Sequence, residues 1–306
     1  MSGGRSKGRL LALPGNEATA KRLAERLGWD TAPLIHRRFP DGESYLRIDA
    51  DLNQCSAVVV ATLNDPDAII PSLLFVADLA RDLGAVRVGL VCPYLCYMRQ
   101  DQRFRPGEAL TSKTFARCLS AHFDWLVTVD PHLHRYASLD EIYTLESEVL
   151  TAAPAIADWV DSNIDQPVLI GPDGESEQWI RAVAEIARWP WRVFKKTRHG
   201  DRDVQMELPA LDAIQGRQPV LIDDIISSGS TIAEATRHLC AAGLAAPVVV
   251  GVHGLHDERA RHTLQQAGVA RLICTNSVAN ADAGIDLSGV MTGAIHRLAR
   301  AGQNPA

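Results

Sequence analysis

The sequence predicts an α/β fold, because short apolar runs alternate along the chain with segments of helical period. The apolar runs are rich in β-branched residues, which is typical of buried strands. Strands that alternate with helices form βαβ units, so we expect parallel sheets with ligand sites at the carboxyl ends of their strands. The expected strands are Leu10–Leu13, Val58–Ala61, Val86–Val91, Leu126–Val129, Val168–Ile170, Val220–Ile222, Val248–Val252 and Leu272–Cys274.

Helices are expected between these runs, where apolar residues recur on one helical face. The three clearest faces are Leu73, Ala77, Ala80 and Leu83, then Ile180, Val183, Ala184 and Ala187, then Ile232, Ala235, Thr236 and Leu239. Polar residues mark two helix starts, Asn16 before Glu17 and Ser72 before Leu73. Gly84 and Gly243 mark two helix ends, since glycine favours the conformation that closes a helix.

The 306 residues suggest two domains, at roughly 100–200 residues for each. Val58–Cys92 and Val220–His253 share one plan: an apolar strand, a polar turn with Asp, a helix closed by Gly, and a second strand. Repeated βαβ units also occur within single domains, so the echo alone leaves a duplication open. We expect domains at 1–150 and 151–306, divided where Pro154 interrupts an Ala-rich stretch, and the last helix could pack back on the first domain.

Composition excludes several classes of function. The net charge is -6, with 31 Lys and Arg against 37 Asp and Glu, which argues against nucleic-acid binding as the main role. The apolar runs are too short to cross a bilayer, and Leu10–Leu13 is far shorter than a signal-peptide core. Six scattered cysteines without C-x-x-C spacing indicate reduced thiols. We therefore expect a cytoplasmic protein without a nucleic-acid or membrane partner.

The segment Val220–Thr231 carries the most informative chemistry. Asp223 and Asp224 end a buried strand, where an unpaired charge is costly. The small and hydroxyl residues that follow can converge their backbone N–H groups on a phosphate at a helix N-terminus. Because carboxylates repel phosphate, the acidic pair suits sugar hydroxyls or a hydrated Mg²⁺, and the segment predicts a pentose 5-phosphate site. A capped helix after an ordinary strand is the alternative. The expected ligand residues are Asp223, Asp224, Ser227, Ser228, Gly229, Ser230 and Thr231.

This segment resembles the signature that phosphoribosyltransferases share with ribose-phosphate pyrophosphokinases. Further motifs, in the same order and at similar spacing, resemble those of the pyrophosphokinases alone and cover nearly the whole chain. They are Arg38–Glu43, Pro93-Tyr94, Arg99–Asp101, Phe104–Glu108, Thr128–His132, Gly171–Gly174, Lys196–Arg198 and Val252–Leu255. The sequence has neither a G-x-x-x-x-G-K-[ST] nor a strand-linked G-x-G-x-x-G motif, which argues against a Walker loop and a dinucleotide site.

The resemblance implies a ribose-phosphate diphosphokinase with two similar phosphoribosyltransferase-like domains, each a parallel sheet flanked by helices. Such an enzyme transfers the pyrophosphoryl group of MgATP to the 1-hydroxyl of ribose 5-phosphate and releases AMP. The first domain would hold ATP and the oligomer contacts, and the second the ribose 5-phosphate loop and a catalytic flap. Mg²⁺ is the implied cofactor, ATP and ribose 5-phosphate are the implied ligands, and a homo-oligomer of at least a dimer is implied.

Residues of the first domain are expected to bind ATP. Phe39 beside Asp41 and Glu43 offers an aromatic face and acceptors for an adenine amino group. The guanidinium groups of the Arg99–Arg105 segment suit polyphosphate oxygens, although such a loop is more often a solvated surface. With the resemblance, the expected ATP-binding set is Phe39, Asp41, Gly42, Glu43, Arg99, Gln100 and Asp101.

The resemblance also implies metal and catalytic residues. His132 and Asp173 would lie around Mg²⁺ and the ATP phosphates, with the histidine acting through water because imidazole is an unusual Mg²⁺ ligand. His134 is expected to be a loop or packing histidine. By composition, the charged segment from Phe194 onward is an exposed hairpin, and by resemblance Lys196 and Arg198 are the cations of a flap that closes over substrates.

The chain departs from the family pattern at a few positions. Ser227, Ser228 and Ser230 replace Asp, Thr and Gly. Glu175 stands where the family usually has a run of glycines, and Pro131 replaces an aliphatic residue. Three alternatives therefore stay open. They are a phosphoribosyltransferase, a non-catalytic regulatory homologue, and a metal-dependent hydrolase built on His132 and His134.

Overall fold

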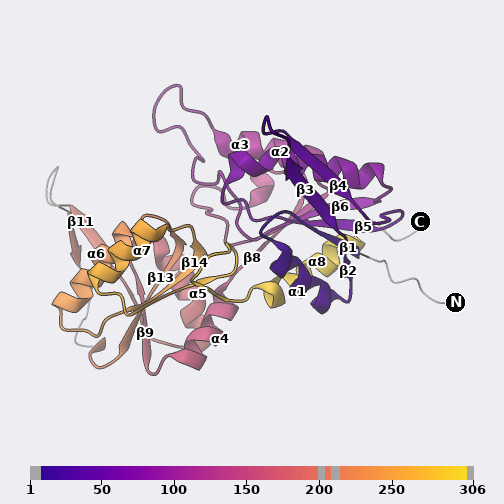
Figure 1. Ribbon diagram of the computed structural model, residues 1–306. Coiled ribbons are helices and arrows are strands. Elements are labelled where there is room, and N and C mark those ends of the chain that lie inside the picture. Colours follow the sequence, from indigo (N-terminus) through magenta and orange to yellow (C-terminus); the bar gives the residue numbers. More distant parts are fainter. Residues whose placement is uncertain (1–7, 199–203, 208–213, 302–306) are drawn as a thin grey trace. The chain divides into compact units, whose positions relative to one another are not determined.

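The computed structural model describes residues 8–198, 204–207 and 214–301 of the chain (Figure 1). These residues divide into two compact units. The first is Met1–Leu150 together with Ser288–Ala306, and the second is Thr151–Leu287. The last helix of the chain therefore belongs with the first unit. The α/β class and the parallel sheets flanked by helices that the sequence predicts are confirmed.

Unit 1 is built on a six-stranded sheet in the order β2-β1-β5-β6-β7-β8, and every strand pair is parallel. Every residue of the central strands β5 and β7 is buried, as expected where helices cover both faces of a parallel sheet. The strands are β1 (Gly8–Ala12), β2 (Asp30–Thr31), β5 (Ser56–Val60), β6 (Arg87–Cys92), β7 (Trp125–Val129) and β8 (Glu146–Leu150), with an antiparallel hairpin of β3 (Leu34–Arg38) and β4 (Ser44–Ile48). The helices are α1 (Glu17–Leu27), α2 (Pro66–Asp82), α3 (Thr111–His122), the 3₁₀ turn η1 (Leu139–Glu141) and α8 (Ser288–Arg300).

Unit 2 has a second six-stranded parallel sheet, in the order β10-β9-β13-β14-β15-β16. Its strands are β9 (Pro167–Gly171), β10 (Trp191–Val193), β13 (Gln218–Ile226), β14 (Val248–Gly254), β15 (Arg271–Thr275) and β16 (Ala283–Ile285), with a hairpin of β11 (Lys195–Arg198) and β12 (Val204–Glu207). Its helices are α4 (Ala153–Asn163), η2 (Gly174–Ser176), α5 (Glu177–Ala187), α6 (Ser230–Ala241) and α7 (Glu258–Ala267).

The two units repeat one plan. In each, the first strand in sequence is second in the sheet order, and a two-stranded hairpin precedes the strand that lies beside it. The two similar segments noted in the sequence correspond to β5-α2-β6 and β13-α6-β14. In each sheet, these two strands are third and fourth in the order. The terminal helix fits the plan as well: α8 packs on α1, as Figure 1 shows, just as α4 packs on α5.

One local expectation is wrong. Helix α2 begins at Pro66 instead of near Ser72, because proline is favoured in the first turn, where its missing N–H costs nothing. Pro154 also lies in the first turn of a helix, α4. Within the part of the chain that the structure describes, no helix is both long and apolar enough to cross a bilayer.

Candidate active site

Asp223 and Asp224 lie inside β13 and do not end it, contrary to the expectation from sequence. The strand continues to Ile226, where Ile225 and Ile226 still pair with residues of β14. The sequence favoured an earlier end because charges are costly inside a parallel sheet. The neighbouring strand β14 is long enough to keep the backbone groups paired past the acidic residues. Asp224 is buried, with 5% of its surface exposed.

Several carboxylates gather near the carboxyl end of the unit 2 sheet. Burial raises the pKa of the Asp223 carboxyl well above its usual value, and the charges of Asp224, Asp173 and Glu175 raise it further. The backbone N–H of Asp224 donates to Asp223 Oδ1 at 3.2 Å and opposes that shift. A field of this sign repels phosphate and attracts cations and hydroxyl donors.

The loop after β13 is the expected phosphate site, and it leads into the N-terminus of α6. Gly229 precedes helix α6 with a φ of 72°, a left-handed conformation that glycine adopts at little cost. A Cβ at this position would lie 3.1 Å from Leu264 Cγ of α7, so a side chain there would require Leu264 to shift by a few tenths of an ångström. Ser228 Oγ lies 3.0 Å from Ser230 Oγ, and both serines are exposed. The loop therefore presents hydroxyl groups and the N–H groups of the first turn of α6, which favour an anion. The rest of the expected set lies around Gly229, with Ser227 exposed and Thr231 partly buried.

Asp173 follows β9, the strand beside β13, and caps the turn η2. Its Oδ1 accepts the backbone N–H of Glu175 at 3.1 Å, and Ser176 Oγ donates to its carbonyl at 2.6 Å. A Cβ on Gly171 would meet Ser176 Oγ at 2.5 Å, so glycine is required at the end of β9. Glu175 is exposed in this turn. The cap fixes the Asp173 carboxylate at the carboxyl end of the sheet.

The expected adenine residues lie in the tight turn between β3 and β4. The Phe39 N–H donates to the carbonyl of Glu43 at 2.8 Å, and the Gly42 N–H donates to the carbonyl of Phe39 at 2.9 Å. Asp41 Oδ1 accepts the Glu43 N–H at 3.2 Å, and Gly42 has a φ of 96°. The four expected residues of this turn are all exposed, and 40% of the Phe39 surface is accessible to solvent. The turn is thus rigid and offers an aromatic ring and two carboxylates to solvent.

Arginines hold this turn in place. The Arg37 guanidinium lies over two rings, 4.7 Å from the Phe39 centroid and 4.0 Å from that of Tyr45. Arg38 donates to the carbonyls of Gly42 and Ala68, each at 2.9 Å, and so ties the turn to α2.

The residues expected to bind the ATP phosphates follow β6. Arg99 is exposed, and Gln100 is partly buried and accepts a hydrogen bond from Thr111 Oγ1 at 3.0 Å. Asp101 differs from its neighbours, because its side chain is only 2% exposed and pairs with Arg135 Nη1 at 2.8 Å. The structure therefore presents Arg99 to solvent and turns Asp101 inward.

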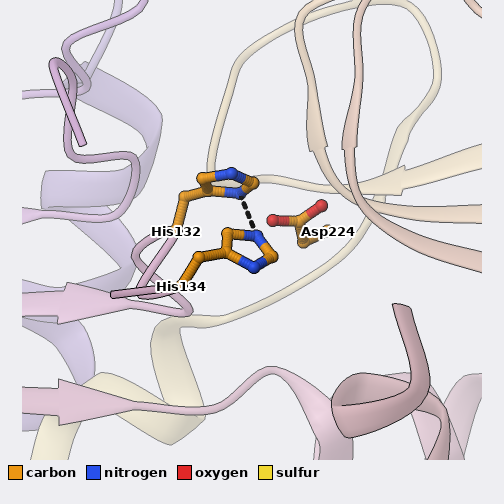
Figure 2. A group of neighbouring side chains, drawn as sticks. All are labelled: His132, His134 and Asp224. Carbon is orange, nitrogen blue, oxygen red and sulfur yellow. Dashed lines mark hydrogen bonds between the residues drawn. The ribbon is translucent and has the colours of Figure 1, made fainter. Parts of the chain in front are cut away.

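His132 and His134 contact each other in the loop after β7. Nε2 of His134 lies 3.2 Å from Nδ1 of His132, and the ring centroids are 3.9 Å apart in an edge-to-face arrangement, as Figure 2 shows. The loop begins at Asp130, which has a φ of 37°. The sequence predicted His134 to be a loop or packing histidine, with a metal role only in the hydrolase alternative. Its spacing of two residues was the available signal, and the tight backbone turn brings the two rings together.

Lys196 and Arg198 lie on β11, in the hairpin that the composition predicts. Lys196 is opposite Met206 and Arg198 is opposite Val204 in the antiparallel register with β12. The remainder of the expected flap, residues 199–203, lies outside the described residues.

Two family models match the chain. The N-terminal domain of ribose phosphate pyrophosphokinase matches residues 9–122, and the phosphoribosyl transferase domain matches residues 138–287. A ribose-phosphate pyrophosphokinase of Methanopyrus kandleri is 34% identical over 263 residues, which are 85% of this chain and 89% of that protein. The chain belongs to the ribose-phosphate pyrophosphokinase family. The family predicted from the sequence motifs is thereby confirmed.

Other family members agree. A ribose-phosphate pyrophosphokinase of Methanosarcina acetivorans is 30% identical over 292 residues, 95% of this chain and all (100%) of that protein. The crystal structure of phosphoribosylpyrophosphate synthetase from Mycobacterium smegmatis superimposes with a TM-score of 0.82 at 21% identity, covering 95% of this chain and 98% of that one. That likeness shows a shared fold. The match of unit 1 to a pyrophosphokinase domain favours this family over the phosphoribosyltransferases.

Proposed function

We propose that the protein is a ribose-phosphate diphosphokinase, which transfers the pyrophosphoryl group of MgATP to the 1-hydroxyl of ribose 5-phosphate. The observation that carries this proposal is the pairing of two largely buried carboxylates in β13 with a phosphate cradle at the start of α6, in a chain of this family. The strand thus supplies acceptors for the sugar hydroxyls, and the start of the helix supplies donors for the phosphate.

Ribose 5-phosphate would bind to unit 2. Its phosphate would accept hydrogen bonds from the serine hydroxyls and backbone N–H groups of residues 227–231, aided by the α6 dipole. Its hydroxyl groups would donate to Asp223 and Asp224, whose carboxylates gain a favourable partner in place of mutual repulsion. The serines that replace the usual Asp, Thr and Gly keep hydroxyl donors for the phosphate.

ATP would bind to unit 1. The Phe39 ring offers a stacking face, and Asp41 and Glu43 are acceptors for the adenine amino group. Arg99 and Gln100 would contact the phosphates, because a guanidinium fork matches phosphate oxygens. In the family the Phe39 turn serves a neighbouring subunit, so we propose a homo-oligomer of at least two chains.

The donor set fits Mg²⁺. Asp173 carries an anchored carboxylate. The pKa of Asp223 is raised first by burial and then by the charges of Asp224, Asp173 and Glu175, and a divalent cation would relieve this charge repulsion. Asp173 is the residue of unit 2 that would hold the ion, and the family resemblance implies that His132 would act on it through water. Bound Mg²⁺ supplies neutralisation of charge on the phosphate oxygens.

The reaction is an in-line displacement. The 1-hydroxyl oxygen of ribose 5-phosphate forms a bond to the β-phosphorus of ATP. The bond between this phosphorus and the oxygen that bridges the α- and β-phosphates breaks, and AMP leaves with that oxygen. The hydroxyl proton passes to water. Such a transfer depends mainly on positioning and on stabilising charge. Lys196 and Arg198 would supply that stabilisation, because cations are effective where water is excluded.

The activity is tested by incubating the protein with ribose 5-phosphate, MgATP and inorganic phosphate, and measuring AMP. AMP that forms only when the sugar phosphate is present supports the proposal. Formation of ADP would contradict it, and a folded protein that releases no AMP would favour a non-catalytic homologue. Release of pyrophosphate from phosphoribosyl pyrophosphate with a free base would favour a phosphoribosyltransferase.

The role of Lys196 predicts a specific kinetic defect. Lys196→Ala should lower kcat by about 10²–10³-fold, the usual effect of losing one preorganised donor, while the KM values change little. Lys195→Ala is the matched control, because Lys195 is exposed on the same strand and should leave kcat nearly unchanged. Equal losses in kcat and in substrate affinity would contradict a role in the transition state.

A further inference from the structure

Two loops of unit 1 are joined by an ion pair whose carboxylate is buried. The ATP loop, residues 99–108, follows β6 and leads to α3, and the histidine loop, residues 130–137, follows β7. Asp101 of the first loop accepts a hydrogen bond from Arg135 Nη1 of the second at 2.8 Å. The Asp101 side chain is 2% exposed, whereas that of Arg135 is 44% exposed. The carboxylate is therefore enclosed by protein, and the guanidinium covers it from the solvent side.

Two further contacts join the same loops. Tyr136 Oη donates to the backbone carbonyl of Asp101 at 3.1 Å and lies 3.1 Å from Ser112 Oγ at the start of α3. The Arg135 guanidinium also lies over the Phe104 ring, 5.4 Å from its centroid. Because each contact joins one loop to the other, the position of either loop depends on both.

The pair lies beside residues that we propose to contact ATP and the metal ion. Arg99 and Gln100 immediately precede Asp101, and His132 stands three residues before Arg135. An exposed carboxylate next to the ATP phosphates would repel them, so an ATP contact by Asp101 is electrostatically unfavourable. Burial against Arg135 removes that repulsion and gives the carboxylate a structural partner.

We propose that Asp101 is a positioning residue and not an ATP contact, and that through Arg135 it holds the ATP loop and the histidine loop in one geometry. The proposal rests on the proposed function for the identity of the substrate. Loss of the hydrogen bond between Asp101 and Arg135 should let Arg99 and Gln100 move away from the ATP phosphates. The binding of ATP should then weaken, whereas the binding of ribose 5-phosphate should not.

A double-mutant cycle tests the proposal. Asp101→Asn and Arg135→Gln should each raise the KM for MgATP about 10-fold or more, as expected for loss of a hydrogen bond to a charged group. The KM for ribose 5-phosphate should stay within about twofold. The double variant should be no worse than the worse single variant, because both remove one interaction, and Arg135→Lys should recover part of the loss.

A control variant separates positioning from a general loss of stability. Arg81 pairs with Asp124 at 3.1 Å in the same unit, away from both loops. Arg81→Gln should leave the KM for MgATP unchanged. Additive losses in the double variant, or a raised KM in Asp101→Asn alone, would mean that Asp101 acts directly on ATP and would overturn the proposal. Unchanged KM values with lower melting temperatures would also overturn it.

A measurement without substrate keeps this test independent of the proposed function. Hydrogen exchange in the free protein should speed up in residues 99–108 when Arg135 is changed to Gln, and in residues 130–137 when Asp101 is changed to Asn. Arg81→Gln should alter neither loop. If the protein made no AMP but showed this exchange pattern, the proposed function would fail and the coupling would stand. Unchanged exchange in both loops would overturn the coupling.

Discussion

At the scale of single residues, Asp223 combines a structural cost with a use in binding. It lies in the third strand of a six-stranded parallel sheet, where ionised groups lose hydration. Burial first, and then the neighbouring carboxylates, raise the pKa of its carboxyl. The folded protein therefore binds a proton more tightly at Asp223 than the unfolded chain does.

That difference predicts how stability changes with pH. Between the ordinary aspartate pKa and the raised pKa of folded Asp223, the folded state holds more protons, so the free energy of unfolding falls as pH rises through this window. Asp223→Asn removes the ionisable group. Above the window, the variant should therefore unfold at a higher temperature than the parent chain, while losing the proposed binding of ribose 5-phosphate.

Melting temperatures measured from pH 4 to pH 9 check this prediction. Asp161→Asn, an exposed carboxylate in α4 of the same unit, serves as the control and should leave the pH profile unchanged. A parent and an Asp223→Asn variant with parallel profiles would show that Asp223 ionises normally in the folded protein.

At the scale of elements, the proposed phosphate cradle depends on how α6 begins. Gly229 combines a positive φ with contact against Leu264 of α7, so its substitution has two costs. The left-handed conformation costs a residue with a Cβ roughly 1–2 kcal/mol. Gly229→Ala should exceed that cost because of the crowding, and it should also raise the KM for ribose 5-phosphate.

Gly243→Ala is the matched control for this change. Gly243 follows α6 with a φ of 78° and has open space around its Cα, so alanine there has the conformational cost alone. Urea unfolding of both variants measures the difference. Equal losses of stability at the two positions would show that Leu264 yields without cost and that the cradle is less tightly packed than the structure indicates.

The elements that sequence patterns predicted best are the central strands. Val58–Ala61 and Val168–Ile170 read as continuous apolar runs because both faces of a parallel sheet are covered. The edge strands β2 and β8 were not predicted, since their residues are exposed or partly buried and carry no continuous apolar signal. The end of β13 was predicted too early. Asp223 and Asp224 interrupt the apolar pattern, but the strand continues to Ile226 because it still pairs with β14.

At the scale of the whole molecule, the motifs could be assigned from the sequence, but their connections could not. The acidic strand, the small-residue loop and the family followed from residue order alone. The Asp101–Arg135 pair joins residues that are 34 positions apart in the sequence. The burial of the Asp101 carboxylate, which indicates its structural role, arises only in the folded chain. The contact of His134 with His132 likewise depends on a backbone turn that no composition signals.

The division of the chain into units also follows from packing and not from order. Helix α8 is the last helix among the described residues, yet it packs on α1 and against β5 to β8 of unit 1. Ser56 Oγ donates to the carbonyl of Ala299 at 2.9 Å, and Arg26 Nε donates to Ser288 Oγ at 2.9 Å. The first unit is therefore complete only when residues far along the chain have folded onto it.

This packing predicts where a change in the last helix will be felt. Ile295 of α8 is fully buried, and Ile295→Ala should cost about 2–5 kcal/mol as a core cavity. Hydrogen exchange should then accelerate in β1 and β5 to β8, which precede the mutation by more than a hundred residues, and stay slow in β9 and β13 to β15. Ile180→Ala in α5, also fully buried, is the matched control and should reverse the pattern. If Ile295→Ala accelerated exchange equally in both sheets, the two units would unfold as one and α8 would not belong to unit 1 alone.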